Sequence, residues 1–491
     1  RNRLVQVEAT GEAGRRDKIE KREVENRLGQ DDPVDLKMSY GWEIILLFVT
    51  YVVYTQIKDW MRWRKARAFG AKNGCADAPV VPNVLPGGVE RFAGVLTGLK
   101  AILATKFNDF AFGPIRKDNL LSFLGNGIFT SEGEAWSHYR AKLRPQFARS
   151  QVSDLESAQE HLDILWKALP DEDAEGWVGG SEGVDLVPYL FRFTMDVSTE
   201  FLFGSSVGSQ SHVILSNKSG DGAKIEVKED LAFVEAMSYT QEFIAWRIRL
   251  QTLWWMANTK KFRDAEKTCK AYADKFVKLA LEKEIKRDGA AEKKPATTPS
   301  GHEKFVLLDS MVEDTQDPIE LRDQILQILL AGRDTTSALL SWTFLLLARH
   351  PEIFDGLREE VLSALGSSSS TLPTFESLKA CKPLQNVLFE ALRLYPVVPL
   401  NGRVAIRDTV LPEGGGPDHT QPIVVRAGEG VGYSAYVMQR RSELWGEDSD
   451  EFRPERWEGR KLGWDFIGFS GGPRICIGRK FFALFISFPL L

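Results

Sequence analysis

One cysteine near the carboxyl end of the chain has neighbours suited to metal chemistry. From Phe469 to Gly478 the residues follow the spacing F-x-x-G-x-R-x-C-x-G, with Gly472, Arg474 and Cys476 at the inner positions. Glycines let the backbone approach a flat group closely, and the amides of such a loop tune a thiolate by hydrogen bonding. The arginine can pair with a carboxylate. The sequence therefore predicts that Cys476 is a metal ligand.

A second cluster, Ala331 to Thr336, places polar residues inside a long apolar run. Gly332 has no side chain, so the helix is narrower at this position. Thr335 can hydrogen-bond to a backbone carbonyl and bend the helix. A gap in the helical hydrogen bonds beside the acid Asp334 would leave room for a small molecule and a proton route. The alternative is a solvent-facing polar patch, which the apolar residues on both sides argue against.

These polar residues need a long helix to position them. Asp317 followed by Pro318 is a typical helix start, and His350-Pro351 ends the pattern after Arg349. At 1.5 Å per residue the helix would be about 50 Å long. Because it is apolar on nearly every face from residue 325 to residue 347, we expect it to be buried across the centre of a mainly α-helical molecule.

A third set of residues has a structural pattern. Glu390 and Arg393 are spaced i, i+3 on a predicted helix and can form an ion pair, and Arg456 follows in a P-E-R-W segment. Taken alone this is an ordinary helix ion pair.

Together these segments resemble the cytochrome P-450 superfamily, in the family's order, from about residue 80 to Gly478. The resemblance implies a mainly α triangular fold with a small β-rich subdomain around a buried haem b. Cys476 would hold the haem iron and favour O–O cleavage by donating electron density. Phe469, Gly472 and Gly478 would belong to the cofactor-binding loop, and Arg474 would pair with a haem propionate.

The same resemblance assigns roles outside the cysteine loop. Asp334 and Thr335 would be catalytic and deliver protons to dioxygen, with Ala331 over the haem face. Trp136 and Arg140, in a W-x-x-x-R pattern, and Arg403 would contact the propionates. Glu390, Arg393 and Arg456 would hold the loop under the haem.

More particular stretches resemble the fungal microsomal enzymes that hydroxylate n-alkanes and fatty acids. Examples are the residues from Gly133 to Ser150 and from Gly432 to Arg441. The resemblance implies electrons from NADPH through NADPH–cytochrome P-450 reductase, with terminal hydroxylation as the finer expectation. The predicted channel lining, near Ile328 and residues 397–400, is apolar and also suits a terpene or polyketide. An isomerase or dehydratase that uses haem without electrons is a third alternative.

The amino-terminal end predicts a membrane anchor. Residues 1–37 have no usable apolar period and are predicted to be disordered or artefactual. Residues 38–57 would form a helix of about 30 Å, close to the hydrocarbon thickness; a cleaved signal peptide or a buried helix is the alternative. The basic residues that follow favour a cytoplasmic catalytic domain on the endoplasmic reticulum membrane. Residues 58–88 would be a basic, then Pro/Gly-rich linker, and residues 89–491 the catalytic domain.

The carboxyl end departs from the family pattern after Gly478. Ala483 falls one residue late for the family's aromatic-alanine pair, and Pro489 would end any helix. We therefore expect residues 479–491 to come from a retained intron and the domain to be truncated. A non-catalytic haem-binding chain is the corresponding alternative function.

Composition excludes other classes of protein. The formal net charge is -5, whereas a nucleic-acid binder usually has a basic excess. The other three cysteines, Cys75, Cys269 and Cys381, lack CxxC spacing and are predicted to be buried or free thiols without a chemical role. The expected partners are thus the reductase, a lipophilic substrate with O2, and a membrane.

Overall fold

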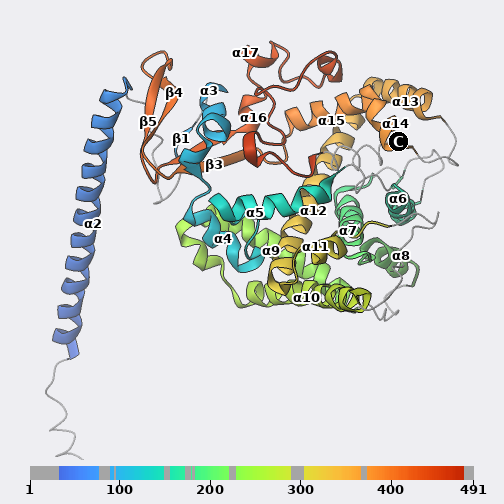
Figure 1. The fold of residues 1–491 in the computed structure, drawn as a ribbon, viewed down its shortest axis with the longest axis horizontal. Coiled ribbons are helices and arrows are strands. Elements are labelled where there is room, and N and C mark those ends of the chain that lie inside the picture. The colour runs from blue at the N-terminus through green and yellow to red at the C-terminus, as the bar shows by residue number, and fades with distance from the viewer. Residues whose placement is uncertain are drawn as a thin grey trace, which may run out of the picture. The chain divides into compact units, whose positions relative to one another are not determined.

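The computed structural model describes residues 33–76, 89–92, 96–148, 155–171, 178–179, 183–219, 228–288, 304–366 and 373–479 (Figure 1). The chain divides into two units, Arg1–Phe69 and Gly70–Leu491. Most of the predicted amino-terminal tail and the segment 480–491 lie outside the described residues.

The described part of the first unit is helical. The helix α2, Pro33–Lys72, continues through the basic residues that follow position 57, so it is longer than the predicted anchor segment 38–57. Several of its large apolar side chains are exposed, among them Leu46, Leu47 and Tyr51. Among the helices of the described residues, none combines the length and apolar character needed to cross a membrane.

The second unit is mainly α-helical, which confirms the predicted fold class at that level. Its helices are α3 (Leu96–Lys100), α4 (Pro114–Leu124), α5 (Gly133–Leu143), α6 (Glu156–Ala168), α7 (Val187–Phe203), α8 (Ser209–Ser219), α9 (Lys228–Leu250), α10 (Lys260–Asp288), α11 (Leu307–Asp314), α12 (Pro318–Arg349), α13 (Pro351–Leu365), α14 (Phe375–Ala380), α15 (Lys382–Leu394), α16 (Ala435–Met438) and α17 (Ser442–Trp445). Short helical turns include η1 (Ala101–Thr105), η7 (Gln251–Ala257), η8 (Pro454–Trp457) and η9 (Gly472–Arg474).

The long helix α12 begins and ends where the sequence predicts. The side chain of Asp317 accepts a hydrogen bond from the amide of Ile319 at 2.9 Å, Pro318 occupies the first turn, and His350 follows the last residue. Half of its 32 residues are buried, and it packs against α4, α7, α10, α11, α13 and α15. Figure 1 shows α12 in the middle of these helices. The predicted central helix is therefore confirmed.

A small β-rich part accompanies the helices. The strands β1 (Val89–Phe92), β6 (Gly430–Ser434), β3 (Leu400–Ala405) and β2 (Phe110–Ala111) form one sheet in that order, and β4 (Thr409–Gly415) pairs with β5 (Gln421–Val425) in a second. The β1–β6 pair is parallel, and the other pairs are antiparallel. Register places Arg403 of β3 opposite Val431 of β6, so the first sheet carries one predicted site residue.

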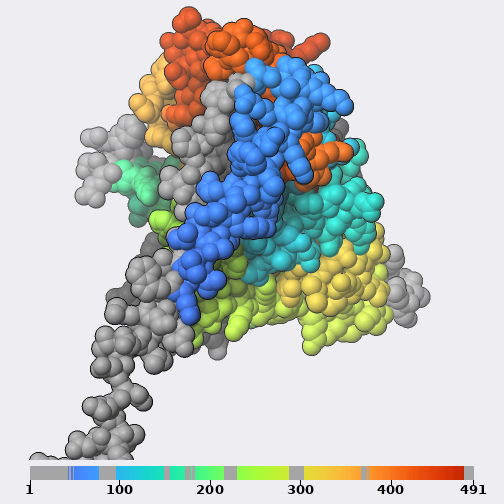
Figure 2. All heavy atoms as spheres, turned by 90° about the vertical axis from the view of Figure 1, so that its left-hand side faces the viewer, coloured from blue at the N-terminus to red at the C-terminus, as the bar shows by residue number. Residues whose placement is uncertain are grey.

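Two apolar clusters form most of the core. One joins α6, α7, α13, α15 and the second half of α12 to Trp445, Trp457 and Phe466. The other joins α4, α5, α9, α10 and α11 to the first half of α12. Figure 2 shows the face where α4 and α5, in turquoise, lie above α10, in yellow-green. Because α12 belongs to both clusters, apolar side chains pack against it before and after its polar middle turns.

Candidate active site

The cysteine loop is a tight turn that rests on the π-helical turn η1. The amide of Cys476 donates to the carbonyl of Phe469 at 3.0 Å, and the amide of Ile475 donates to the carbonyl of Gly472 at 3.1 Å. Gly472 has φ +65°, and a Cβ there would lie 1.9 Å from the backbone oxygen of Leu103. Only glycine fits this position, so the loop requires Gly472 for its contact with η1.

The side chain of Cys476 is exposed, although protein atoms crowd around it. This crowding raises the pKa of the thiol by desolvation, while the amide of Gly478 and the charges of Arg140 and Arg479 act to lower the pKa. The amide and the two cations offset part of the cost that burial adds to the thiolate form.

Helix α5 ties the cysteine loop to the rest of the molecule. Arg140 donates from Nη2 to the carbonyl of Ile475 at 2.7 Å. The buried ring of Trp136, one turn earlier, has the guanidinium of Arg140 at 5.7 Å and that of Arg474 at 4.4 Å from its centroid. The structure thus brings Trp136, Arg140, Arg474 and Cys476 together, as the sequence predicts.

Three arginines gather around one aromatic ring beside this loop. The guanidinium carbons of Arg116, Arg403 and Arg474 lie 3.8, 4.4 and 4.3 Å from the centroid of Phe112. The acid among them is Glu132, which accepts from Arg474 Nη2 at 2.7 Å. We call Arg116, Arg140, Arg403 and Arg474 the arginine cluster.

The arginine cluster carries more positive charge than its one acid balances. Burial, followed by the charges of the neighbouring arginines, lowers the pKa of Arg116 to about 10. Burial also lowers the pKa of Arg474 to about 10, with Glu132 opposing the shift and Arg403 adding to it. The buried Nε of Arg116 has no hydrogen-bond partner. Such a cluster favours binding of an anion.

Arg116, Phe112 and Glu132 are site residues that the sequence analysis missed. None of them belongs to a motif with a spacing of its own, because Phe112 precedes α4, Arg116 lies within it and Glu132 precedes α5. They meet Arg403 only through the sheet, where β2 pairs with β3. A signal could have been the apolar context of Arg116, which follows Phe110 to Ile115.

The polar turn of α12 has the contacts that its sequence suggests, with one difference. Thr335 Oγ1 donates to the carbonyl of Ala331 at 2.6 Å, and α12 is helical without a break from Pro318 to Arg349. The expected gap in the helix is therefore not seen, because Thr335 shares a carbonyl with the helix instead of interrupting it. Burial raises the pKa of Asp334, while Arg333 and Gln241 act to lower it.

The predicted structural triad is confirmed as a buried network. Glu390 accepts from Nε and Nη2 of Arg393 at 2.8 Å and from Nε of Arg456 at 2.9 Å. It also accepts from the indole of Trp457 at 2.9 Å and from the amide of Arg453 at 3.0 Å. We call Glu390, Arg393 and Arg456 the carboxylate triad.

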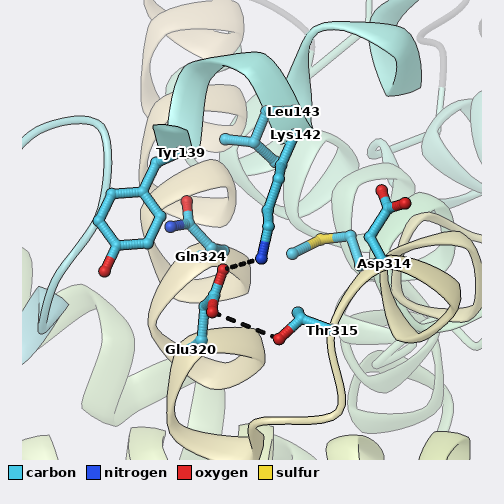
Figure 3. A pocket seen from close by; sticks show the side chains of 8 residues that line it. Tyr139, Lys142, Leu143, Asp314, Thr315, Glu320 and Gln324 are labelled. Atoms are coloured by element: carbon cyan, nitrogen blue, oxygen red, sulfur yellow. Dashed lines mark hydrogen bonds and ion pairs between the residues drawn. The ribbon is translucent and has the colours of Figure 1, made fainter. Parts of the chain in front are cut away.

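The predicted channel residues differ in exposure: Ile328 is buried in the core, whereas Val398 and Leu400 are exposed. A small pocket between α5, α11 and α12 is lined by Tyr139, Lys142, Leu143, Met311, Asp314, Thr315, Glu320 and Gln324 (Figure 3). Lys142 and Thr315 bind Glu320 across it. None of the predicted site residues lines this pocket.

Comparisons with known proteins identify the family. Residues 94–486 match the sequence model of the family Cytochrome P450. The chain is 39% identical over 489 residues to cytochrome P450 monooxygenase g430 of Fusarium sp, covering 91% of this chain and 83% of that protein. It is 43% identical over 397 residues to cytochrome P450 52-E3 of Starmerella bombicola, covering 80% and 72%. It is 42% identical over 389 residues to cytochrome P450 52A6 of Candida tropicalis, covering 78% and 70%. The chain belongs to the cytochrome P450 family.

The described residues fit the haem that this family implies. The thiol of Cys476 is accessible, and its amide and cationic neighbours oppose the rise in its pKa that burial causes. The arginine cluster holds four guanidinium groups and one nearby carboxylate, and the Nε of Arg116 is unsatisfied. A haem supplies one iron for the sulfur and two propionates for the excess positive charge.

Proposed function

We propose that this member of the family is a monooxygenase that places one oxygen atom of O2 into a C–H bond of an n-alkane or fatty acid. The reaction takes substrate, O2, NADPH and one proton and yields an alcohol, water and NADP⁺. The observation that carries the proposal is Cys476, which stands in a tight loop beside four arginines. When bound, the haem supplies the oxygen-activating chemistry, which an axial thiolate promotes.

The chain's own residues would hold that group from the cysteine loop and from α5, β3 and α12. Cys476 would ligate the iron, in a loop completed by Phe469, Gly472 and Gly478. Arg474, Arg140, Trp136 and Arg403 would contact the propionates, and Ala331 would lie over the haem face. The contacts of Arg140 with Ile475 and of Trp136 with Arg474 support this assignment.

Asp334 and Thr335 are proposed as the catalytic residues that move protons to the oxygen. The carboxyl of Asp334 lies in a protein environment that raises its pKa, offset by Arg333. A carboxyl group within reach of the reacting oxygen can relay a proton to it. The hydroxyl of Thr335 already donates to Ala331 at 2.6 Å, so its own oxygen is free to accept.

Electrons would come from NADPH through a reductase. The proposed location is the endoplasmic reticulum membrane, with α2 as the contact and the catalytic unit facing the cytoplasm. Support comes from the basic residues and tryptophans after position 57. The substrate class and terminal hydroxylation rest on the likeness to the fungal alkane and fatty-acid hydroxylases. Terpenes and polyketides are the other apolar substrates to include in a panel.

The first experiment is the carbon monoxide difference spectrum of the reduced protein. Thiolate ligation by Cys476 would give a red-shifted Soret band, and Cys476→Ala would abolish it. Cys75→Ala is the matched control, because Cys75 is a free thiol outside the site and should keep the band. A normal band in Cys476→Ala would refute the assignment of the ligand.

The second experiment measures product formed per NADPH consumed, with dodecanoic acid, n-dodecane and a terpene as substrates. Thr335→Ala should lower this ratio by about tenfold or more while the carbon monoxide band stays normal. Turnover of the fatty acid or alkane supports the proposed class. Turnover of the terpene alone, or normal coupling in Thr335→Ala, would contradict the substrate class or the proton-delivery role respectively.

A further inference from the structure

Arg333, the residue before Asp334 on α12, is buried, and its side chain links α12 to α9. Its Nη2 donates to Ser238 Oγ at 2.9 Å and its Nη1 donates to Gln241 Oε1, both on α9. Its exposed fraction is 6%. An arginine this buried ordinarily has a structural or functional reason for its charge.

The same guanidinium also contacts the proposed proton-delivery acid. Nη1 of Arg333 lies 3.4 Å from Oδ1 of Asp334. Gln241 acts on both partners, because it accepts from Arg333 and its side chain lowers the pKa of Asp334. Asp334 Oδ1 and Gln241 Nε2 are both buried atoms without a hydrogen-bond partner, so a small movement of α9 would alter the surroundings of the carboxylate.

We propose that Arg333 and Gln241 are positioning residues that make the orientation of the Asp334 carboxylate depend on the position of α9. This proposal rests on the proposed function, in which Asp334 delivers protons. Ser238 and Gln241 are three residues apart and lie on one face of α9, so the two bonds act together as a clamp between α9 and α12. We call these four residues, Ser238, Gln241, Arg333 and Asp334, the α9–α12 clamp.

The groups packed around the α9–α12 clamp determine which charges Arg333 can pair with. Its guanidinium lies 5.2 Å from the ring centroid of Phe191 on α7, and burial lowers its pKa while Asp334 and Cys269 of α10 act to raise it. The charge that acts on Asp334 across these described elements is that of Arg333. Arg333 therefore has one carboxylate to pair with, and its other bonds are to neutral groups that a shift of α9 can break.

The residue directly after α9 has an unusual backbone conformation. Gln251, the first residue after α9, has φ 49°, a backbone conformation that costs energy in residues other than glycine. The clamp lies about three turns before this residue, since Gln241 and Gln251 are ten positions apart.

The test uses the haem-loaded protein, dodecanoic acid as substrate and five variants, of which three measure coupling first. Gln241→Leu removes the acceptor of Arg333 at similar volume, Asp334→Asn removes the acid, and Glu242→Gln is the matched control on the exposed face of α9. We expect Gln241→Leu to lower product per NADPH about threefold to tenfold, less than Asp334→Asn does, since it acts through another residue. Glu242→Gln should match the unmodified protein.

Two readouts separate positioning from a purely structural role. Because Gln241 acts to lower the pKa of Asp334, the pH profile of coupling should move to higher pH in Gln241→Leu. Hydrogen–deuterium exchange of α9 amides near residue 241 should rise, with no change in exchange of α15. Arg333→Lys, which keeps the charge and loses the two-pronged contact, should recover part of the pH profile that Arg333→Gln loses.

The outcomes distinguish the clamp from the function on which it rests. If Asp334→Asn lowers coupling and Gln241→Leu changes neither coupling nor its pH profile, the clamp is wrong and the proton-delivery role stands. If Asp334→Asn couples normally, the proton-delivery role itself fails, and the clamp fails with it. A lower coupling in Gln241→Leu with an unmoved pH profile would overturn positioning in favour of simple packing.

Discussion

The carboxylate triad and the arginine cluster both bury arginines, but they balance charge in opposite ways. In the triad, Glu390 and Arg393 have exposed fractions of 0%, and the carboxylate accepts five hydrogen bonds from protein donors. In the arginine cluster, burial and then neighbouring cations lower the pKa of Arg116, and Glu132 is the nearby acid. The first region is complete without a ligand, whereas the second lacks negative charge.

This difference separates a folding role from a binding role by a physical criterion. In a buried ion pair whose donors are all satisfied, removing one partner strongly destabilises the fold, because the other charge is left buried and unpaired. Like charges that the fold holds close together destabilise the folded state until a bound anion neutralises them. The motifs predict that both sets lie near the cysteine loop, and the charge balance distinguishes the set proposed to bind the propionates from the set with a folding role.

Removing the acid of the triad should have the largest effect. Glu390→Gln keeps the shape but leaves the fully buried Arg393 without its counter-charge, whereas Arg456 keeps Asp448, and we expect a loss of about 3–5 kcal/mol in the free energy of unfolding. The control is Glu443→Gln, which removes an exposed acid paired with Arg441 and should cost little. Urea unfolding of both variants measures this. Equal stability of the two would remove the distinction between the regions.

The arginine cluster should respond in the opposite manner. Arg474→Gln should leave the haem-free protein about as stable as before, because removal of one of several repelling charges offsets the loss of its ion pair with Glu132. It should weaken retention of haem by one charged hydrogen bond, about 1.5–3 kcal/mol. Transfer of haem to excess apomyoglobin measures the retention, with Arg456→Gln as the control that lowers stability instead. A large loss of haem-free stability in Arg474→Gln would place it with the triad.

The sequence predicted the parts of this picture that depend on local spacing. The start and end of α12 and the pairing of Glu390 with Arg393 and Arg456 follow from motifs. The arginine cluster could be predicted only in part, because Arg116 reaches Arg403 through the pairing of β2 with β3. Long-range pairing of this kind has no signature within one segment.

The interior of α12 shows a different limit of sequence reasoning. A threonine inside a helix can either interrupt the hydrogen bonds or share a carbonyl, and both patterns look alike in sequence. Thr335 shares the carbonyl of Ala331. The contact of Arg333 with α9 was also not predicted, because nothing in the order of residues indicates which helix packs against that turn.

The smallest expected effect is on the pH dependence of the haem-free protein. The pKa of Arg116 is lowered to about 10 in the folded chain, below its ordinary value of about 12.5. The fold therefore disfavours the charged form, and this cost is fully present below pH 10 and disappears as the pH rises from about 10 to about 12.5. Arg116→Gln removes the cost, so at pH 7 the variant should be the more stable by roughly 1 kcal/mol, the size of one partly solvated charge contact.

Comparison of the two proteins at several pH values tests this sign. Urea unfolding at pH 7, 9 and 10.5 should show the advantage of Arg116→Gln at the first two and a smaller one at the last. Added pyrophosphate at pH 7 should stabilise the unmodified protein more than the variant, because it supplies the missing negative charge. A variant that is less stable at pH 7 would mean that Arg116 is already balanced, and the arginine cluster would then resemble the carboxylate triad.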